Sequence, residues 1–253
     1  VSQQENSFLL TVKDIAKYWV RQGNKITIEA EEPVDLEAIR LFLLGSAMGT
    51  LLHQRALLVL HGCAIEFSEG VVVFVAHSGT GKSTLASHFY QNDFNVFCDD
   101  QAVVDVKNQL LISPGLGQIK LWKTALDEQG LEDDGLDKVH QNHEKYIFPI
   151  NQSGLQAKPL IAVIELEIAD AYQLRSLKGG DKLELLVKHT YRNQYLSNMG
   201  LLKQHFLLCG EVANTVFVAK AIRPAKTDSS ADFFNFILKK LALQGIHPVT
   251  EYA

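Results

Sequence analysis

One short segment combines the residue types and the spacing that phosphate chemistry needs. Residues 76–83 read AHSGTGKS, follow the apolar run VVVFV and precede a stretch of helical character. They match the pattern G-x-x-x-x-G-K-[ST], except that alanine stands at the first position. We therefore expect a phosphate-binding loop (P-loop) that holds a nucleotide. Its predicted contact residues are Ala76, His77, Ser78, Gly79, Thr80, Gly81, Lys82, Ser83 and Thr84.

The fixed residues of this loop each have a chemical reason. Gly79 and Gly81 let backbone amides turn toward the phosphates, where the positive end of the following helix adds to the attraction. Lys82 places an ammonium group on the β- and γ-phosphates, and the Ser83 hydroxyl is a ligand for Mg²⁺. The methyl group of Ala76 is compatible with the loop if its backbone φ is negative and the methyl turns away from the phosphates.

Two acids end the next apolar run, FNVFCDD. Asp99 and Asp100 therefore stand at the C-terminal end of a strand, where α/β sheets bind ligands. Phosphoryl transfer to a hydroxyl needs oxygen ligands for Mg²⁺ and a carboxylate that accepts the proton, and two acids can divide these tasks. Asp100 can also be a turn residue that faces solvent. His61 either hydrogen-bonds one of the acids or is a structural histidine.

Single basic residues further along the chain are candidates for contacts with phosphate or substrate. They are Lys120, Lys145 and Arg192, since phosphoryl-transfer sites often recruit an additional cation. Each can equally be an ordinary surface or ion-pair residue. Trp122 follows Leu121, and we expect it to pack in the core.

The elements that position these residues are strands and helices in mixed order. Apolar and β-branched runs predict strands at 8–12, 25–30, 56–60, 63–67, 71–76, 95–100, 102–106, 110–113, 161–168 and 215–220. Helices are predicted at 35–55 with Asp35 as its cap, at 84–91, near 121–129, within 180–209 and at 229–243. This order predicts an α/β fold with a mixed central sheet that carries the P-loop. We expect a small N-terminal β-hairpin plus helix (1–55) packed on a P-loop domain (56–253).

Residues 127–144 form an acidic segment punctuated by glycine, with seven acids in DEQGLEDDGLDKVHQNHE. We interpret the segment as a mobile surface excursion. It is either a lid or substrate loop, or simply a solvated loop.

Composition excludes several classes of protein. The chain has 253 residues, 47% of them hydrophobic and 21% charged, which is the balance of a soluble globular protein. A net charge of −5 without a basic stripe gives no reason to expect nucleic acid. The three cysteines form no CxxC pair, and the polar N-terminal residues lack a signal-peptide pattern, so we expect a cytoplasmic protein. The apolar stretch 41–52 is shorter than the about 20 residues of a membrane helix, so we expect a buried helix and no membrane contact.

The motifs together resemble a known family. An H-G-x-x-[IV] strand at His61, the S-G-x-G-K-S loop and a D-D pair sixteen residues after Ser83 are similar to the catalytic domain of HPr kinase/phosphorylase, which shares its fold with ATP-dependent phosphoenolpyruvate carboxykinase. Short kinases of bacterial peptide-modification clusters, such as lasso-peptide kinases, resemble the chain further. The similar segments are LLGSAMGTLLHQR, Pro114-Gly115, Lys120-Leu121-Trp122, Glu144-Lys145-Tyr146 and His189-Thr190-Tyr191-Arg192.

This resemblance implies roles for individual residues. Asp99 would be the base toward an acceptor serine, Asp100 would support the metal, and His61 would contact the catalytic acid. The implied cofactors are ATP and Mg²⁺, and the implied assembly is a homo-oligomer. Residues 1–55 differ from the N-terminal domain of HPr kinases, and the glycine-rich signature that follows the acids in that family is missing, so we expect neither HPr as substrate nor reversal by phosphate.

We therefore expect an ATP-dependent serine kinase that acts on a protein or peptide hydroxyl. A small-molecule kinase of the same fold is one alternative. A nucleotide-binding regulatory or maturation protein with little catalysis is the other.

Overall fold

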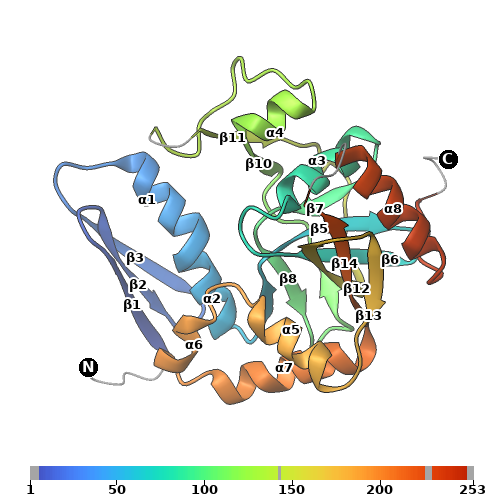
Figure 1. Cartoon of the computed structure of the whole chain (residues 1–253). Coiled ribbons are helices and arrows are strands. Elements are labelled where there is room, and N and C mark those ends of the chain that lie inside the picture. The colour runs from blue at the N-terminus through green and yellow to red at the C-terminus, as the bar shows by residue number, and fades with distance from the viewer. Residues whose placement is uncertain (1–5, 142–143, 226–229, 250–253) are drawn as a thin grey trace.

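An antiparallel sheet of three strands opens the described part of the chain (Figure 1). The computed structural model describes residues 6–141, 144–225 and 230–249. The strands are β1 (Ser7–Val12), β2 (Ala16–Arg21) and β3 (Lys25–Ala30), which pair in chain order. The sequence predicted a hairpin without β2. In AKYWVR the alternate residues Ala16, Tyr18 and Val20 are buried, but polar and charged neighbours concealed this strand pattern.

One long helical stretch crosses this sheet. It consists of α1 (Leu36–Phe42), a π-helical segment η1 (Leu43–Ala47) and α2 (Met48–Gln54). The predicted cap is confirmed, since Asp35 Oδ1 accepts a hydrogen bond from Ala38 N at 2.9 Å. The core between helix and sheet consists of Ala16, Tyr18, Val20, Ile39, Ala47 and Leu51. By length and composition, Leu36–Gln54 could cross a membrane, and 39% of its most apolar window is buried inside the protein.

A mixed sheet of nine strands forms the centre of the molecule (Figure 1). Its order is β4-β8-β9-β12-β6-β5-β7, with β14 added beside β12 and β13 beside β14. The bounds are β4 (Leu58–Leu60), β5 (Gly62–Phe67), β6 (Gly70–Val75), β7 (Val96–Cys98), β8 (Ala102–Asp105), β9 (Leu111–Ile112), β12 (Lys158–Ala169), β13 (Gln173–Ser176) and β14 (Phe217–Pro224). The expected α/β fold with a mixed sheet is thus confirmed. Because β6, β12 and β14 are parallel, their C-terminal ends meet at one edge.

Helices cover both faces of this sheet. On one face, α3 (Lys82–Gln91) and α8 (Ser230–Ala242) contribute apolar side chains to one core, including Phe89 and Ile237. On the other face, α5 (Gly180–Lys188) and α7 (Leu202–Thr215) contribute Leu186 and Val212 to a second core. The short helix α6 (Gln194–Asn198) lies between α5 and α7 in the chain. Residue 229, where the last helix was predicted to begin, lies outside the described residues.

A separate two-stranded sheet lies beside the P-loop helix, and the sequence did not predict it. Strands β10 (Gln118–Trp122) and β11 (Lys145–Pro149) pair antiparallel, and helix α4 (Lys123–Glu128) follows β10. The prediction that Trp122 packs in the core is wrong, because 48% of it is exposed. In a strand, alternate side chains face opposite sides, so burial of Ile119 and Leu121 turns Trp122 outward.

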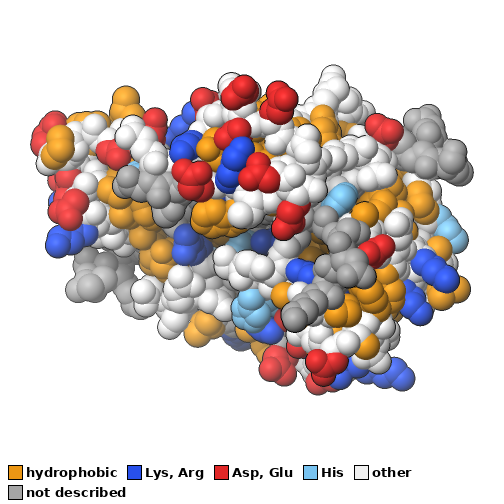
Figure 2. Space-filling view, turned by 45° about the horizontal axis from the view of Figure 1, so that its top comes forward, with side chains coloured by type: hydrophobic (Ala, Val, Ile, Leu, Met, Phe, Trp, Pro, Cys, Tyr) orange, Lys and Arg blue, Asp and Glu red, His pale blue; other side chains and the backbone are white. Residues whose placement is uncertain are grey.

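The acidic segment 127–144 lies at the surface between α4 and β11, apart from residues 142–143, which are outside the described part. Lys123 Nζ binds Asp133 Oδ1 at 2.8 Å, and Lys138 Nζ binds Glu144 Oε1 at 2.9 Å. In Figure 2, acidic side chains gather on the upper middle part of the surface, where α4 and this segment lie. The domain boundary at residue 55 stays a prediction.

Candidate functional site

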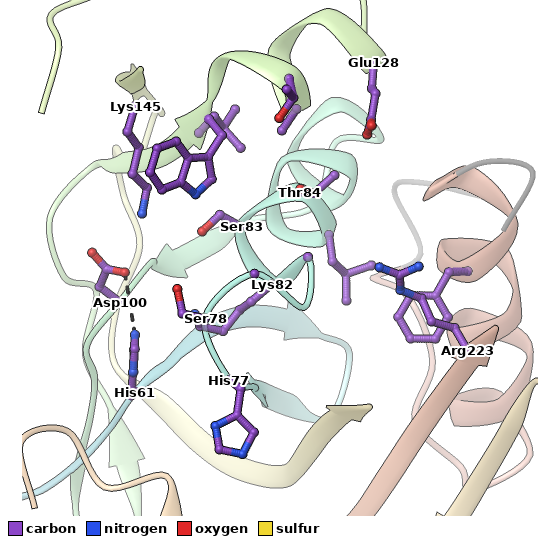
Figure 3. Close-up of a pocket in the computed structure, with 18 of the residues that line it drawn as sticks. His61, His77, Ser78, Lys82, Ser83, Thr84, Asp100, Glu128, Lys145 and Arg223 are labelled. Atoms are coloured by element: carbon purple, nitrogen blue, oxygen red, sulfur yellow. Dashed lines mark ion pairs between the residues drawn. The ribbon is translucent and has the colours of Figure 1, made fainter. Parts of the chain in front are cut away.

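The loop between β6 and α3 has the backbone geometry of a phosphate-binding turn. Gly79 and Gly81 adopt φ values of 83° and 97°, a region that side chains with a Cβ rarely enter. Gly81 caps α3, so the first turn of the helix points its free backbone amides at the loop. Lys82, the first residue of α3, is 8% exposed and extends into the same cavity (Figure 3).

Ala76 occupies the position where the consensus loop has glycine. It is absent from the described residues with positive φ, and it is 2% exposed. Its methyl group packs in the core with side chains of β5, β6 and α3. The substitution therefore places the extra methyl away from the cavity, as the sequence predicted.

Asp99 lies directly behind the loop serine. The Ser83 hydroxyl donates to Asp99 Oδ1 and Oδ2 at 3.3 and 3.2 Å, and the backbone N–H of Lys120 donates to Oδ2 at 3.0 Å. Burial, and next the carboxylate of Asp100, raise the pKa of Asp99 above its usual range. The Ser83 hydroxyl and the Asp99 carboxylate therefore lie together beside the predicted phosphate site.

Asp100 turns its carboxylate the other way, into the cavity. Its backbone φ of 75° is left-handed, which aspartate tolerates better than most residues. Lys120 Nζ binds Asp100 Oδ2 at 2.7 Å. In Figure 3 the His61 ring points toward the same carboxylate, with Nε2 4.0 Å from Oδ1. Burial alone would raise the pKa of Asp100, but the Lys120 ammonium lowers it to about 2. Asp100 is therefore a cavity residue rather than a solvent-facing turn residue.

His61 is a neutral neighbour of this acid. Burial, and next the Lys82 ammonium, lower the pKa of His61 to about 4, so its imidazole is uncharged at pH 7. The ring packs edge-on against Tyr191 with centroids 5.6 Å apart. The family resemblance placed His61 against Asp99 as the catalytic acid, whereas its nearest acid here is Asp100.

The cavity itself has a volume of about 620 Å³ (Figure 3). The sequence-predicted residues that line it are His61, His77, Ser78, Gly79, Gly81, Lys82, Ser83, Thr84, Asp100 and Lys145. Thr80, Asp99 and Lys120 lie immediately beside it through the contacts given above and below. Arg192 is exposed and stacks its guanidinium 5.4 Å from the ring centroid of Tyr191.

Several lining residues were missed from the sequence. Arg223, at the C-terminal end of β14, lines the cavity and donates from Nη2 to Thr80 O at 3.3 Å. Trp122 also lines the cavity beside the predicted residue Lys145, whose ammonium lies 5.7 Å from the indole centroid. Glu128 of α4 and Phe233 of α8 also line the cavity. If the strand predicted at 215–220 had been extended to residue 223, Arg223 would have been expected at the same sheet edge as the P-loop.

Ser83 and Asp99 fit a magnesium ion. Among the described residues no group of three or more His, Cys, Asp or Glu side chains could hold a metal. Mg²⁺ does not require such a cage, because it is commonly bound through one or two carboxylates together with substrate phosphates and water. The Ser83 hydroxyl and the Asp99 carboxylate, 3.2–3.3 Å apart, are donors of this hard oxygen type. In contrast to the prediction from resemblance, the acid beside Ser83 is Asp99.

A buried cluster of polar side chains around Glu165 supports the backbone of the site. Glu165 of β12 lies opposite Val75 in the strand that leads into the P-loop. Its Oε1 binds His189 Nε2 and Lys188 Nζ, both at 2.7 Å, and its Oε2 binds Lys220 Nζ at 3.0 Å. The carbonyl of His189 accepts from the backbone N–H of His61 at 2.7 Å. The cluster therefore fixes the backbone that carries His61.

Comparison with known protein families finds no match, and no curated protein matches the chain. Among solved structures, the chain is similar to the Hpr(Ser) kinase/phosphatase from Coxiella burnetii. The identity is 13%, the match covers 74% of this chain and 93% of that one, and the TM-score is 0.38. A likeness of this size assigns neither a family nor an activity, so what the site can do follows from its own geometry.

Proposed function

We propose that the protein is a kinase that transfers the γ-phosphate of ATP to a hydroxyl, with a serine of a protein or peptide as acceptor. The observation that carries this proposal is the pair of acids at the P-loop. One carboxylate meets the loop serine, and the next residue presents its carboxylate to the cavity. Simple nucleotide binding needs only the loop, whereas transfer to a hydroxyl also needs a group that accepts its proton.

The contacts support a division of roles between the acids that reverses the one implied by resemblance. Asp99 and Ser83 would hold Mg²⁺, which when bound supplies positive charge to the phosphates. Asp100 would accept the proton of the acceptor hydroxyl. It faces the cavity and is held by Lys120 Nζ at 2.7 Å, while neutral His61, 4.0 Å away, does not compete for the proton at pH 7.

Charge on the reacting phosphate is balanced by side chains of this chain. Lys82 and Lys145 line the cavity, and Lys120 is bound to Asp100 at its edge. In the reaction the acceptor oxygen forms a bond to the γ-phosphorus, the bond from that phosphorus to the β–γ bridging oxygen breaks, and ADP leaves. The hydroxyl proton passes to Asp100. Positioning and electrostatic stabilisation thus account for most of the expected catalysis.

Two isosteric variants test the proposal. Purified protein is incubated with Mg-ATP labelled in the γ-phosphate and a set of serine peptides, including peptides encoded beside the gene. Asp100→Asn is expected to lower transfer by about 10²–10⁴-fold while nucleotide affinity and the Mg²⁺ requirement persist. Asp99→Asn is expected to raise the Mg²⁺ concentration needed for nucleotide binding.

The outcomes separate the assignments. Undiminished transfer by Asp100→Asn overturns its role as base. If Asp99→Asn abolishes transfer with an unchanged Mg²⁺ requirement, the role implied by resemblance holds instead. Nucleotide binding without transfer to any peptide or small hydroxyl compound overturns the kinase and favours a nucleotide-binding regulator.

A further inference from the structure

A second cavity of about 420 Å³ lies between α1 and the β10–β11 sheet, and we call it the α1 groove. Its helix wall includes Arg40, Leu41 and Leu44, and its sheet wall includes Lys120 and Ile147. Leu41 and Leu44 are only partly buried and belong to none of the hydrophobic cores. Apolar side chains that a helix directs away from its own core are available to a ligand.

Both ends of the helix wall are fastened to the P-loop domain. At one end, His140 Nε2 lies 3.6 Å from Asp35 Oδ2, the carboxylate that caps α1. At the other end, Gln101 Nε2 donates to the carbonyl of Leu44 at 2.8 Å. Because Gln101 directly follows the acid pair, the groove wall is tied to the catalytic residues themselves.

The groove and the nucleotide cavity share one face of the β10–β11 sheet. Lys120 pairs with Ile147 in register, and Trp122 pairs with Lys145. Paired residues, and residues two apart along a strand, lie on the same face. Lys120 and Ile147 line the groove, and Trp122 and Lys145 line the nucleotide cavity. The Lys120–Asp100 ion pair lies between the two. The groove therefore leads to the Lys120–Asp100 ion pair, and Asp100 also lines the nucleotide cavity.

The charges around the groove favour a basic occupant. Within the described residues, no hydrogen bond or ion pair engages the carboxylates of Glu37 and Asp137, which line it. Of the cations that line the groove, Lys120 and Lys138 are bound to Asp100 and Glu144, so among the described residues only Arg40 stands unpaired against these two acids. Exposed acids of the neighbouring segment, such as those at 132 and 134, extend the negative field.

We propose that the α1 groove binds the acceptor, a peptide segment in which an apolar side chain and a basic residue flank the hydroxyl. The apolar side chain contacts Leu41 and Leu44, and the basic residue meets Glu37 or Asp137. The hydroxyl then lies at the Lys120–Asp100 pair. This inference rests on the proposed kinase function and adds its acceptor site.

A matched pair of leucine variants on α1 tests the inference. Leu41→Glu places a charge in the groove, whereas Leu36→Glu places one at a position on the same helix that is 74% exposed. Transfer is measured with serine peptides that carry leucine near the serine and either lysine or glutamate beyond it. Nucleotide affinity is measured separately with a fluorescent ATP analogue.

We expect Leu41→Glu to raise the acceptor KM at least about tenfold, with the affinity for Mg-ATP unchanged, because a buried leucine contact is lost. Leu36→Glu should match the wild type, and the wild type should prefer the lysine peptides to the glutamate peptides. Equal acceptor KM in Leu41→Glu and wild type overturns the groove while leaving the kinase intact. A wild type that binds Mg-ATP but transfers phosphate to no peptide overturns the kinase function and the groove with it.

Discussion

Replacing Glu165 by glutamine removes the negative charge that Lys188, Lys220 and His189 contact, while keeping the side-chain shape. His189 is 4% exposed at its side chain and cannot reach water, whereas Lys188 and Lys220 are 39% and 20% exposed and can turn outward. Breaking a buried ion pair costs about 3–5 kcal/mol, and partial solvation of the two lysines reduces this to about 2–4 kcal/mol. For a domain of this size the melting temperature should fall by roughly 5–15 °C.

The pKa of Glu165 determines how the effect of this substitution on the unfolding free energy changes with pH. Burial alone would raise the pKa of Glu165, but hydrogen bonds from His189, Lys188 and Lys220 hold it well below its usual range. A carboxyl group whose pKa is lowered by folding stabilises the folded protein at pH values above its pKa in the unfolded chain, which is about 4.3 for glutamate. This stabilisation is lost as the pH falls below that value. The difference in unfolding free energy between wild type and Glu165→Gln should narrow by about 1 kcal/mol from pH 7 to pH 3.5.

Urea unfolding followed by far-ultraviolet circular dichroism measures both quantities. Glu167→Gln is the matched control on the same strand, since Glu167 is 43% exposed and pairs with Lys220 at 3.2 Å. It should cost less than about 1 kcal/mol. A difference for Glu165→Gln that is as small as the control, or that stays constant down to pH 3.5, would refute the electrostatic account.

Two further predictions concern the site and its support. The chain has two tryptophans, and in a Trp19→Phe variant the emission of Trp122 should change when Mg-ATP binds, because the indole lines the cavity; unchanged emission at a nucleotide concentration that equilibrium dialysis shows to be saturating would contradict this. In Gly49→Ala the new methyl would lie 2.8 Å from the ring of Tyr191, so we expect a loss of about 1–3 kcal/mol in urea unfolding, whereas Gly210→Ala on α7 meets no atom within 4 Å and should be neutral or stabilising. Equal stability of the two alanine variants would count against tight packing at Tyr191.

The sequence was informative where function depends on neighbouring residues. The P-loop is a local pattern of glycines and a lysine between a strand and a helix, so position 76 and its negative φ could be anticipated. The acid pair likewise ends its own strand. Its orientation could not be predicted, because Asp100 turns inward only through a left-handed backbone and an ion pair with Lys120.

Features that depend on distant pairing were missed. Strands β10 and β11 are separated by α4 and the acidic segment, so nothing local indicated that Trp122 would face the loop beside Lys145. The sequence indicated only that Glu165 belongs to an apolar strand. Its partners are Lys188 at the end of α5, His189 directly after that helix and Lys220 of β14. The two walls of the α1 groove come from segments far apart in the sequence, one within 37–44 and the other within 118–147. No local sequence pattern could indicate that they lie together.

The hydrogen bond from Gln101 to Leu44 of η1 joins two parts of the chain that have different tasks in the proposed function. The P-loop and the residues that line its cavity all follow residue 55, while the helix wall of the groove lies entirely before it. With the proposed acceptor site, substitutions in the first part would change which acceptor fits without altering the P-loop, provided that the Gln101–Leu44 bond keeps the wall in place. Exchanging residues 1–55 between related chains would then be a route to new acceptor preference with the phosphate chemistry conserved.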